Sequence, residues 1–548
     1  MRGGAAGGAA PPGAPLAQPR GRLDPVAFPA DAGEVAVVRT SQANNDRLSV
    51  FPSLQLDRRA RPPEGEASLA VEPGVTYQTF LGFGGSFTES ASDLFMSLGP
   101  TNQERVVEAC FSPERGLGYQ MGRIHINSCD FSEGNWSCHD DEDPALSSFS
   151  ITRYWRSVLP LVRRAERAAR ARVRLIASPW SPPAWMKTNG RMTSGGKLRP
   201  DLHECWADFF VRFAQEMHIA GFPLWAMTVQ NEPLAKTGWE NCLFTAEEER
   251  DFIRDFLGPA LALAAPGVKL LAWDHNRDGL LARARALYAD REAAKHIWGL
   301  GFHWYGDPRY ESWPDKAGQL CYDNVARVHE LRPDKHLVMT EACQEGGPHL
   351  REWTLGERYA ENIIRDLNNH TEAWIDWNLL LDSSGGPNHA GNYCSAPILV
   401  DPQRDLIIFQ SSFYYIGQFS RFILPGAKRV LCACSRDALE CTAFRNPDGG
   451  LAVVVLNQSE AGVNFWLDIA GLGAAQAHAP KHSITTFLAR VAGAGGAAGR
   501  PAPAGPRGRG PRPRPEPGAA APGLAGVGAL GLLVRRGRRL VGGGQRRR

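Results

Sequence analysis

The chain has 548 residues, of which 43% are hydrophobic and 9% aromatic, enough to build a large core and a second, smaller domain. Its net charge of +3 is unevenly distributed, because residues 495–548 carry twelve arginines against one acid, which leaves −8 on the rest. A mildly acidic body argues against a nucleic-acid or anionic-membrane partner for the folded part.

The two ends of the chain, residues 1–33 and 491–548, are low-complexity segments of Gly, Ala, Pro and Arg. We expect both to be disordered, because they cannot bury enough apolar surface to offset the entropy of ordering. The first lacks the apolar run of a signal peptide, which favours a cytoplasmic protein and leaves secretion open. In the second, the apolar stretch 523–534 is shorter than the about 20 residues of a spanning helix. Its arginines attract phosphates without regard to sequence, so no specific nucleic-acid partner is expected.

The eleven cysteines are odd in number and show no repeated spacing. The close pair Cys432 and Cys434 lacks a second pair, or nearby histidines, at zinc-site spacing. We interpret the cysteines mostly as buried thiols rather than as disulfides or metal ligands, so neither a metal nor a cofactor is expected.

Short apolar runs that fit β-strands begin in residues 34–74. Between residues 75 and 418, eight further runs alternate with helical stretches, which is the pattern of repeated βα units. Eight such units in roughly 300 residues predict a closed (β/α)8 barrel. The runs lie near Phe80 and end at Ile126, Pro179, Gln230, Asp274, His303, Glu341 and Leu380.

Residues 419–490 change to short alternating runs such as RVLCACS and LAVVVLN, separated by Gly, Asn and Asp. This pattern predicts an antiparallel β-sandwich, which the strands of residues 34–74 can complete. The predicted fold class is therefore α/β: a TIM barrel with a side antiparallel β-sandwich built from N- and C-terminal strands.

Two carboxylates stand at strand ends of the predicted barrel, where active sites of this fold lie. Glu232 follows the fourth strand within NEP, and Glu341 ends the seventh within TEAC. A single Glu at a strand end is more often a salt-bridge or capping residue. Two at the same end of one barrel fit glycoside hydrolysis, which needs one group to protonate the leaving oxygen and one to attack or stabilise the sugar carbon.

Seven segments, in the same order and over roughly residues 75–490, resemble the glucosylceramidase family, glycoside hydrolase family 30. They are LGFGGSFTES, GRIHINSCDFS, ASPWSPPAWMKTNG, MTVQNEP, GFHWYGD, VMTEAC and WIDWNLLLDSSGGPNH. The resemblance implies a barrel with a side β-sandwich and a retaining double-displacement mechanism, with Glu232 as acid/base and Glu341 as nucleophile.

The same resemblance implies roles for the residues around the two glutamates. Asp130 would bind sugar hydroxyls, Asn231 the 2-hydroxyl, and Trp180 and Trp377 would form the aromatic pocket. His303 and Tyr305 would be further substrate-binding residues, and together with the supporting residue Arg123 they would surround and orient the nucleophile. A cation near Glu341 would keep it ionised, while Glu232, in a drier position, would stay protonated.

Each of these residues also has a simpler interpretation. The tryptophans, Trp185 and Trp304 among them, fit core aromatics, and His303 alone fits a hydrogen-bonded structural histidine. Glu89 and Glu345 lie in or beside motifs, and we expect a loop or helix-start residue and a surface residue, respectively.

The expected substrate is a β-glucoside such as glucosylceramide, so the partner is a carbohydrate or glycolipid. Residues 131–149 and 190–200 resemble the bacterial branch of the family, and strand-end loops of this kind set specificity. A β-1,6-glucanase or another retaining β-glycosidase on the same scaffold stays an alternative, as does a carbohydrate-binding pseudoenzyme. The sequence predicts neither the oligomeric state nor the pH optimum.

Overall fold

The computed structural model describes residues 23–305 and 321–491. Most of the predicted disordered leader, and almost all of the predicted tail, lie outside these residues. The end of the leader is ordered, however: Leu23, Val26 and Phe28 pack against the main hydrophobic core. These three apolar side chains give the end of the leader its buried surface.

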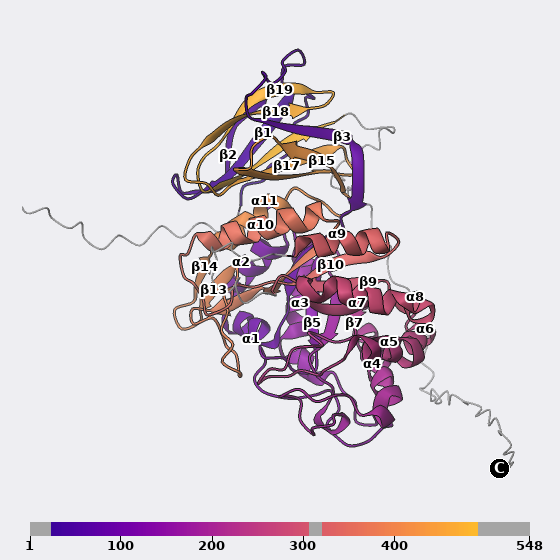
Figure 1. Ribbon diagram of the computed structural model, residues 1–548. Helices are drawn as coiled ribbons and strands as arrows, with labels where there is room; N and C mark the ends of the chain where they lie inside the picture. The colour runs from indigo at the N-terminus through magenta and orange to yellow at the C-terminus, as the bar shows by residue number, and fades with distance from the viewer. Residues whose placement is uncertain (1–22, 306–320, 492–548) are drawn as a thin grey trace, which may run out of the picture. The chain divides into compact units, whose positions relative to one another are not determined.

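Eight parallel strands close into a barrel, as predicted (Figure 1). Their close packing uses glycine, since a Cβ at Gly84 would lie 2.2 Å from the backbone oxygen of Met121 on the neighbouring strand. All eight predicted runs are barrel strands. They are β4 (Gly82–Ser86), β5 (Met121–Ile126), β6 (Arg174–Pro179), β7 (Leu224–Thr228), β8 (Lys269–Asn276), β9 (Gly299–His303), β10 (His336–Glu341) and β11 (Ala373–Asn378).

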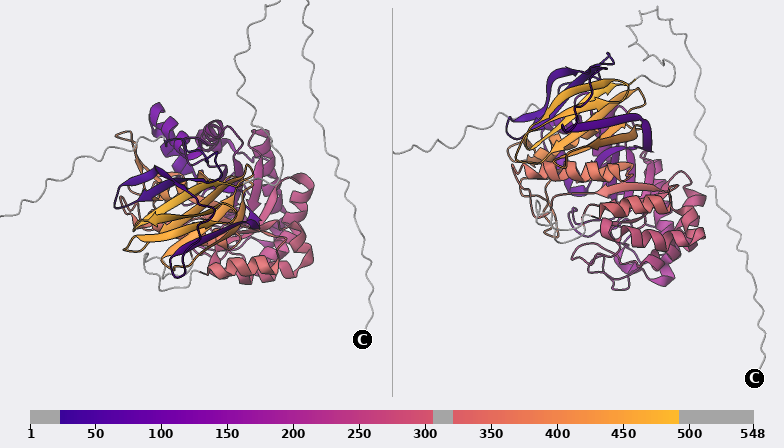
Figure 2. Two further views of the ribbon diagram at one scale, coloured as in Figure 1. Left: turned by 90° about the horizontal axis from the view of Figure 1, so that it is seen from above. Right: turned by 45° about the horizontal axis from the view of Figure 1, so that its top comes forward.

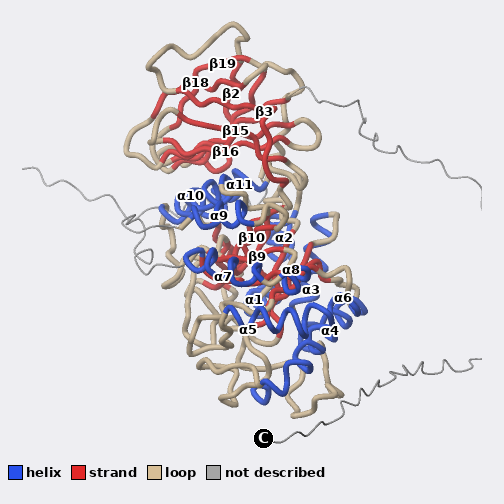
Figure 3. Tube along the Cα trace, turned by 45° about the vertical axis from the view of Figure 1, so that its right-hand side comes forward, coloured by secondary structure: helices blue, strands red, loops and turns tan. Residues whose placement is uncertain are grey.

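Helices surround the barrel strands (Figure 3). Their starts follow sequence signals: the Thr88 hydroxyl accepts a hydrogen bond from the Ala91 N–H at the start of α1, and Thr245 and Glu248 form a capping box at the start of α5. The helices are α1 (Glu89–Ser97), α2 (Pro100–Phe111), α3 (Val158–Ala169), α4 (His203–Ile219), α5 (Ala246–Phe252), α6 (Gly258–Ala264), α7 (Arg277–Ala289), α8 (Arg291–His296), α9 (Tyr322–Leu331), α10 (Thr354–Asn368) and α11 (Ser411–Ser420), with the short turns η1 (Thr152–Arg156), η2 (Ala184–Met186), η3 (Pro200–Leu202) and η4 (Ile253–Leu257).

The β-sandwich combines strands from both ends of the described chain, which confirms the second part of the predicted fold (Figure 2). It is mostly antiparallel, but β3 pairs in parallel with β18. Its strand order is β19-β18-β3-β15-β16-β17-β20-β1-β2. The strands are β1 (Glu34–Ser41), β2 (Asp46–Gln55), β3 (Ser68–Thr79), β15 (Lys428–Cys434), β16 (Leu439–Arg445), β17 (Gly450–Asn457), β18 (Val463–Ile469), β19 (Gly473–Ala479) and β20 (Ser483–Arg490).

A third, small sheet was not predicted. It contains β12 (Leu380–Asp382), β13 (Ile398–Asp401) and β14 (Leu406–Phe409) and follows the last barrel strand. The loop between β12 and β13, residues 383–397, reaches the site described below.

The barrel interior separates an apolar lower part from a polar upper end. Side chains such as Met121, Leu271 and Ile375 pack together inside the barrel. Polar and charged side chains follow at the carboxyl ends of the strands. The apolar layer therefore lies below the polar site and separates it from the other end of the barrel.

Two further predictions can be compared with the structure. All eleven cysteines are free, eight of them buried and three partly exposed, which agrees with the prediction of thiols. Within residues 23–305 and 321–491, none of the helices is both long and apolar enough to cross a bilayer.

One buried ion pair joins two helices of the barrel layer. Arg277 of α7 contacts Asp366 of α10 at 2.7 Å, and their side chains are 1% and 0% exposed. Arg277→Met should lower the free energy of unfolding by about 3–5 kcal/mol, because it leaves a buried carboxylate without its cation. Urea unfolding measures this change.

The matched control is Arg332→Met, whose pair with Asp334 is 31% and 58% exposed. Its loss should change the free energy of unfolding by about 0–1 kcal/mol. Equal losses in the two variants would show that the buried pair does not stabilise the barrel.

Candidate active site

A cavity of about 320 Å3 lies at the carboxyl ends of the barrel strands. Side chains from several strand ends and from the loops that follow them line it. They are Asp130, Trp180, Asn231, Glu232, Ala235, Trp239, His275, Asn276, Tyr305, Glu341, Cys343, Glu345, Arg358, Trp377, Asn392 and Cys394.

Arg123 of β5 lies beneath the cavity with no exposed surface. Its guanidinium donates hydrogen bonds to Glu341 Oε2 at 2.5 Å, to Asn231 Oδ1 at 2.8 Å and to Asp274 Oδ2 at 2.8 Å. The guanidinium carbon also lies 4.7 Å from the ring centre of Trp180. One cation therefore connects the ends of β7, β8 and β10.

Asp274 of β8 is the second centre of this network. Besides Arg123, it accepts hydrogen bonds from the hydroxyls of Thr228 at 2.7 Å and Thr340 at 2.6 Å, and His303 Nε2 lies 3.1 Å away. Burial alone would raise the pKa of Asp274, but the charge of Arg123 and the hydrogen bonds hold this pKa well below its usual range. Asp274 is thus a permanent buried anion.

The backbone at Asp274 is strained in order to direct this side chain inward. Trp273 and Asp274 have φ values of 72° and 49°, and β8 carries a bulge at this point in its pairing with β9. Left-handed conformations at such residues cost about 1–3 kcal/mol each. The buried carboxylate of Glu249, itself paired with Arg283, accepts the N–H of Trp273 at 2.9 Å and so supports the bulge.

Glu232 lies four residues after the end of β7 and also has a left-handed backbone, with φ 47°. Its Oε1 lies 3.0 Å from His303 Nδ1 and 3.6 Å from His275 Nδ1. Burial would raise the pKa of Glu232, but His275, His303 and Arg123 outweigh it and lower this pKa.

Glu341 ends β10 and accepts hydrogen bonds from Arg123 and, at 3.2 Å, from the Tyr305 hydroxyl. Burial raises its pKa, and the charges of His303 and Arg123 offset only part of this effect. The charge of Glu232 raises the pKa of Glu341 further, so the two carboxylates influence each other electrostatically.

These pKa directions are the reverse of those expected from the sequence, because burial outweighs the nearby cations at Glu341, whereas the cations outweigh burial at Glu232. His303 resolves the difference in part. Its two ring nitrogens face Glu232 and Asp274, and its pKa is raised to about 9 despite burial by the charge of Glu341 and by its contacts with Asp274 and Glu232. The ion pair of imidazolium and carboxylate holds the same single proton as a neutral His303 beside a protonated Glu232. The His303–Glu232 pair therefore stores one proton at the cavity wall.

The structure gathers most of the predicted site residues around one cavity. Asp130, Trp180, Asn231, Tyr305 and Trp377 line it, and the rings of Trp180 and Trp377 stack 5.1 Å apart. His303 was predicted among the substrate-binding residues, but it lies buried beneath the cavity and contacts Glu232 rather than Glu341. Trp304 is a core aromatic, which matches the simpler interpretation.

Several site residues were missed in the sequence. Asp274 ends an apolar run, so the strand-end rule that identified Glu341 applies to it as well, and His275 follows it. Glu345 was expected at the surface, but it lines the cavity and pairs with Arg358 at 3.0 Å.

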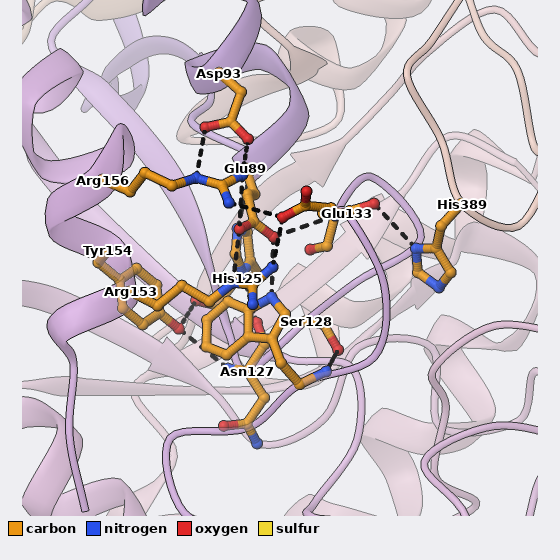
Figure 4. Close-up of polar contacts among 12 residues, drawn as sticks. Glu89, Asp93, His125, Asn127, Ser128, Glu133, Arg153, Tyr154, Arg156 and His389 are labelled. Carbon is orange, nitrogen blue, oxygen red and sulfur yellow. Dashed lines mark hydrogen bonds and ion pairs between the residues drawn. The ribbon is translucent and has the colours of Figure 1, made fainter.

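Glu89 does not line the cavity but joins a cluster of polar contacts beside α1 (Figure 4). It begins α1 and is buried, with its carboxylate 2.7 Å from Arg153 and 2.9 Å from the indole nitrogen of Trp136. The expectation of a helix-start residue agrees with this position.

Glu232, His275 and His303 bring possible metal-ligand atoms within 4.8 Å of one another. Imidazole and carboxylate suit transition metals such as Zn²⁺. Within the described part of the chain, this trio is therefore the group that can hold a metal ion, and it includes a carboxylate of the cavity.

The comparisons with known proteins cover both parts of the fold. Residues 80–423 match the Glycosyl hydrolase family 30 TIM-barrel domain, and residues 426–487 match the Glycosyl hydrolase family 30 beta sandwich domain. Lysosomal acid glucosylceramidase from Mus musculus is 36% identical over 484 residues, 85% of this chain and 91% of that protein.

Two solved structures are similar over 84% of this chain and 100% of their own. SrfJ from Salmonella typhimurium superposes with a TM-score of 0.77 at 33% identity. The endo-β1,6-glucanase BT3312 superposes with a TM-score of 0.74 at 26% identity.

The network predicts a measurable change in the titration of His303. Asp274→Asn should lower the pKa of His303 from about 9 towards its ordinary value, because the imidazolium loses a hydrogen-bonded anion. NMR titration of 13C-labelled histidines measures it, with Asp278→Asn on the surface of α7 as the control. An unchanged His303 pKa in Asp274→Asn would show that Asp274 does not hold the proton in this network.

Proposed function

The chain belongs to glycosyl hydrolase family 30, and from this premise we propose that it is a retaining β-glycosidase of the glucosylceramidase type. Glu232 is the acid/base and Glu341 the nucleophile. The observation that carries the proposal is the pair of interacting carboxylates at two strand ends of one cavity. Each has different partners: Arg123 and Tyr305 at Glu341, and two histidines at Glu232.

In the first step, a carboxylate oxygen of Glu341 attacks the anomeric carbon while the bond from that carbon to the aglycone oxygen breaks. Arg123 and Tyr305 fix the orientation of Glu341 by donating to its two oxygens. The leaving oxygen takes the proton held by Glu232 and His303. The product is a glycosyl ester of Glu341 and a free alcohol.

In the second step, Glu232 removes a proton from water, and the resulting hydroxyl attacks the anomeric carbon and releases Glu341 as a carboxylate. The two displacements on one carbon retain its configuration. His303 supports both steps, because the His303–Glu232 pair can give up a proton and then accept one, while the other hydrogen bonds of the network stay the same.

The sugar is oriented by groups whose own direction is fixed. Asn231 Oδ1 accepts from Arg123, so its NH₂ group must face the cavity, where it can donate to a 2-hydroxyl. Asp130 accepts two amide hydrogen bonds at Oδ2, and Oδ1 has no donor among the described residues, so it can accept from a sugar hydroxyl. Trp377 and Trp180 form the apolar wall.

The proposed substrate is a β-glucoside, with glucosylceramide as the leading candidate because of the similarity to the mouse glucosylceramidase. A cavity of about 320 Å3 is at the small end of ligand sites, which supports removal of a single terminal sugar. The similarity to the endo-β1,6-glucanase supports a second candidate, a β-1,6-glucanase. Hydrolysis rates on an aryl β-glucoside, glucosylceramide and a β-1,6-glucan separate the two.

The division of labour predicts different responses to the leaving group. Glu232→Ala should reduce kcat/KM by about 10²–10⁴-fold for an alkyl β-glucoside but much less for a dinitrophenyl β-glucoside, whose leaving group needs no proton. Glu341→Gly should be equally impaired on both, because the attack on carbon is lost. Steady-state kinetics on the two substrates measure the ratio.

Azide then distinguishes the two roles by product configuration. In Glu232→Ala, azide should release the glycosyl-enzyme as the β-azide. In Glu341→Gly, azide should attack from the vacated face and give the α-azide. Proton NMR of the products decides: swapped anomers would mean that the two assignments are inverted. If the wild-type protein hydrolysed none of the aryl β-glucoside, glucosylceramide and the β-1,6-glucan, a carbohydrate-binding pseudoenzyme would be favoured.

A further inference from the structure

A loop tip formed by residues 387–392 covers one wall of the proposed sugar site. Its side-chain amides, Asn388 and Asn392, donate to Asp130 Oδ2 at 3.2 and 3.0 Å, and the N–H of His389 donates to the Asp130 carbonyl at 3.2 Å. Since Asp130 and Asn392 both line the cavity, the position of this tip sets the shape of that wall.

The base of the same loop is hydrogen-bonded to residues 344–347, which follow β10. Gly347 donates to the Tyr393 carbonyl, Ser395 donates to the Gln344 carbonyl, and Glu345 forms a β-bridge with Cys394. The tip itself is largely at the surface, and it buries little apolar area. A segment of this kind opens at low free energy unless polar contacts hold it.

His389 provides such a contact through both ring nitrogens. Nδ1 lies 3.1 Å from the Ser132 carbonyl oxygen, and Nε2 lies 3.4 Å from Glu240 Oε2. A carbonyl and a carboxylate can only accept, so both nitrogens are satisfied only when both carry a proton. The geometry therefore favours the imidazolium form, and the side chain is 19% exposed. Figure 4 shows His389 beside the loop that follows β5.

Glu240 is the other half of this contact. It follows β7 and is fully buried, and neither of its carboxylate oxygens accepts a well-formed hydrogen bond from the described residues. A buried anion in this state is costly without a cation. Burial would raise the pKa of Glu240, yet His389 and Ser128 lower it.

We propose that His389 is a positioning residue which, as an imidazolium paired with Glu240, fastens the 387–392 tip over the sugar site and keeps Asn388 and Asn392 on Asp130. This role rests on the proposed β-glycosidase function of the cavity. We call the contact between His389 and Glu240 the latch. It joins three loops, which follow β5, β7 and β12, and thereby holds one side of the sugar pocket.

The latch depends on pH in a defined direction. The pKa of His389 is raised above 6.5, mainly by Glu240, and that of Glu240 is lowered below 4.5. The pair is therefore complete between these two values and is lost as pH rises through the raised pKa of His389. The charge of Asp130 also favours the His389 cation, and Glu240 also interacts electrostatically with His125.

The test compares His389→Gln, Glu240→Gln and the double variant with wild type, on an aryl β-glucoside between pH 5 and 9. In wild type, KM should be low at pH 5.5 and rise at alkaline pH. Each single variant should raise KM about tenfold at pH 5.5, with kcat changed less than threefold. The KM of the double variant at pH 5.5 should equal that of each single variant. In all three variants, KM should no longer rise with pH. Glu240→Gln and the double variant contain no unpaired buried charge, so they keep the test valid if His389→Gln folds poorly.

His482→Gln is the matched control. His482 also has two acidic partners, with Nδ1 2.9 Å from Glu357 and Nε2 3.0 Å from Glu460, but it lies on the sandwich. Its loss should leave the pH profile of KM unchanged. Additive effects of the His389 and Glu240 substitutions, or a KM that still rises with pH in His389→Gln, would overturn the proposal.

A readout without substrate separates this proposal from the proposed function. Hydrogen exchange followed by mass spectrometry at pH 5.5 should show protection of peptides covering residues 387–392 in wild type and in His482→Gln, and loss of it in the His389 and Glu240 variants. Unchanged protection in those variants would overturn the latch. If the wild-type protein hydrolysed no β-glycoside but the His389 and Glu240 variants still lost protection as expected, only the proposed function would be contradicted.

Discussion

The buried ion pair between Arg123 and Asp274 is the interaction on which the site depends. Two charged groups with no exposed surface lie at the centre of the barrel, and removal of one partner from such a pair costs about 3–5 kcal/mol. The pair persists because each guanidinium nitrogen and each carboxylate oxygen has a partner: Thr228, Thr340 and His303 also contact Asp274, and Asn231, Ser178 and Glu341 also contact Arg123. Six neighbouring strands, β5 to β10, are thereby fixed relative to one another, and with them the two glutamates.

The backbone carries the strain that this arrangement requires. Asn127, Glu232, Trp273 and Asp274 all adopt left-handed conformations at or just after a strand end, a region that is unfavourable for residues other than glycine. The strain at Asp274 directs its carboxylate to Arg123, and the strain at Glu232 directs its carboxylate towards His303. The apolar layer inside the barrel and the helices around it supply the stability that holds these conformations.

The sequence was sufficient to predict the barrel, because eight apolar runs with helical stretches between them are a repeated local pattern. The strand-end rule and the motifs also predicted a site at Glu232 and Glu341, and both residues line one cavity. The pKa directions could not be predicted, since they depend on how closely His275 and His303 approach Glu232 across strands. The orientation of Asp274 depends on a bulge that has no sequence signal of its own. The β12–β14 sheet consists of strands of only three or four residues, too short to show a clear pattern. The 387–392 tip contacts residues far away in the chain, such as Asp130. Leu23, Val26 and Phe28 were not predicted because they follow a long Gly- and Ala-rich stretch of sequence.

The central claim is that Glu341 becomes covalently attached to the sugar while Glu232 only transfers protons. A 2-deoxy-2-fluoro β-glucoside with a good leaving group tests it most directly, because the fluorine slows release of the glycosyl-enzyme more than its formation when the leaving group is activated. Mass spectrometry of the digested protein should find one fluoroglucosyl group, on the peptide that contains Glu341. A label on the peptide that contains Glu232 would contradict the account, as would an unlabelled protein that releases sugar with inverted configuration.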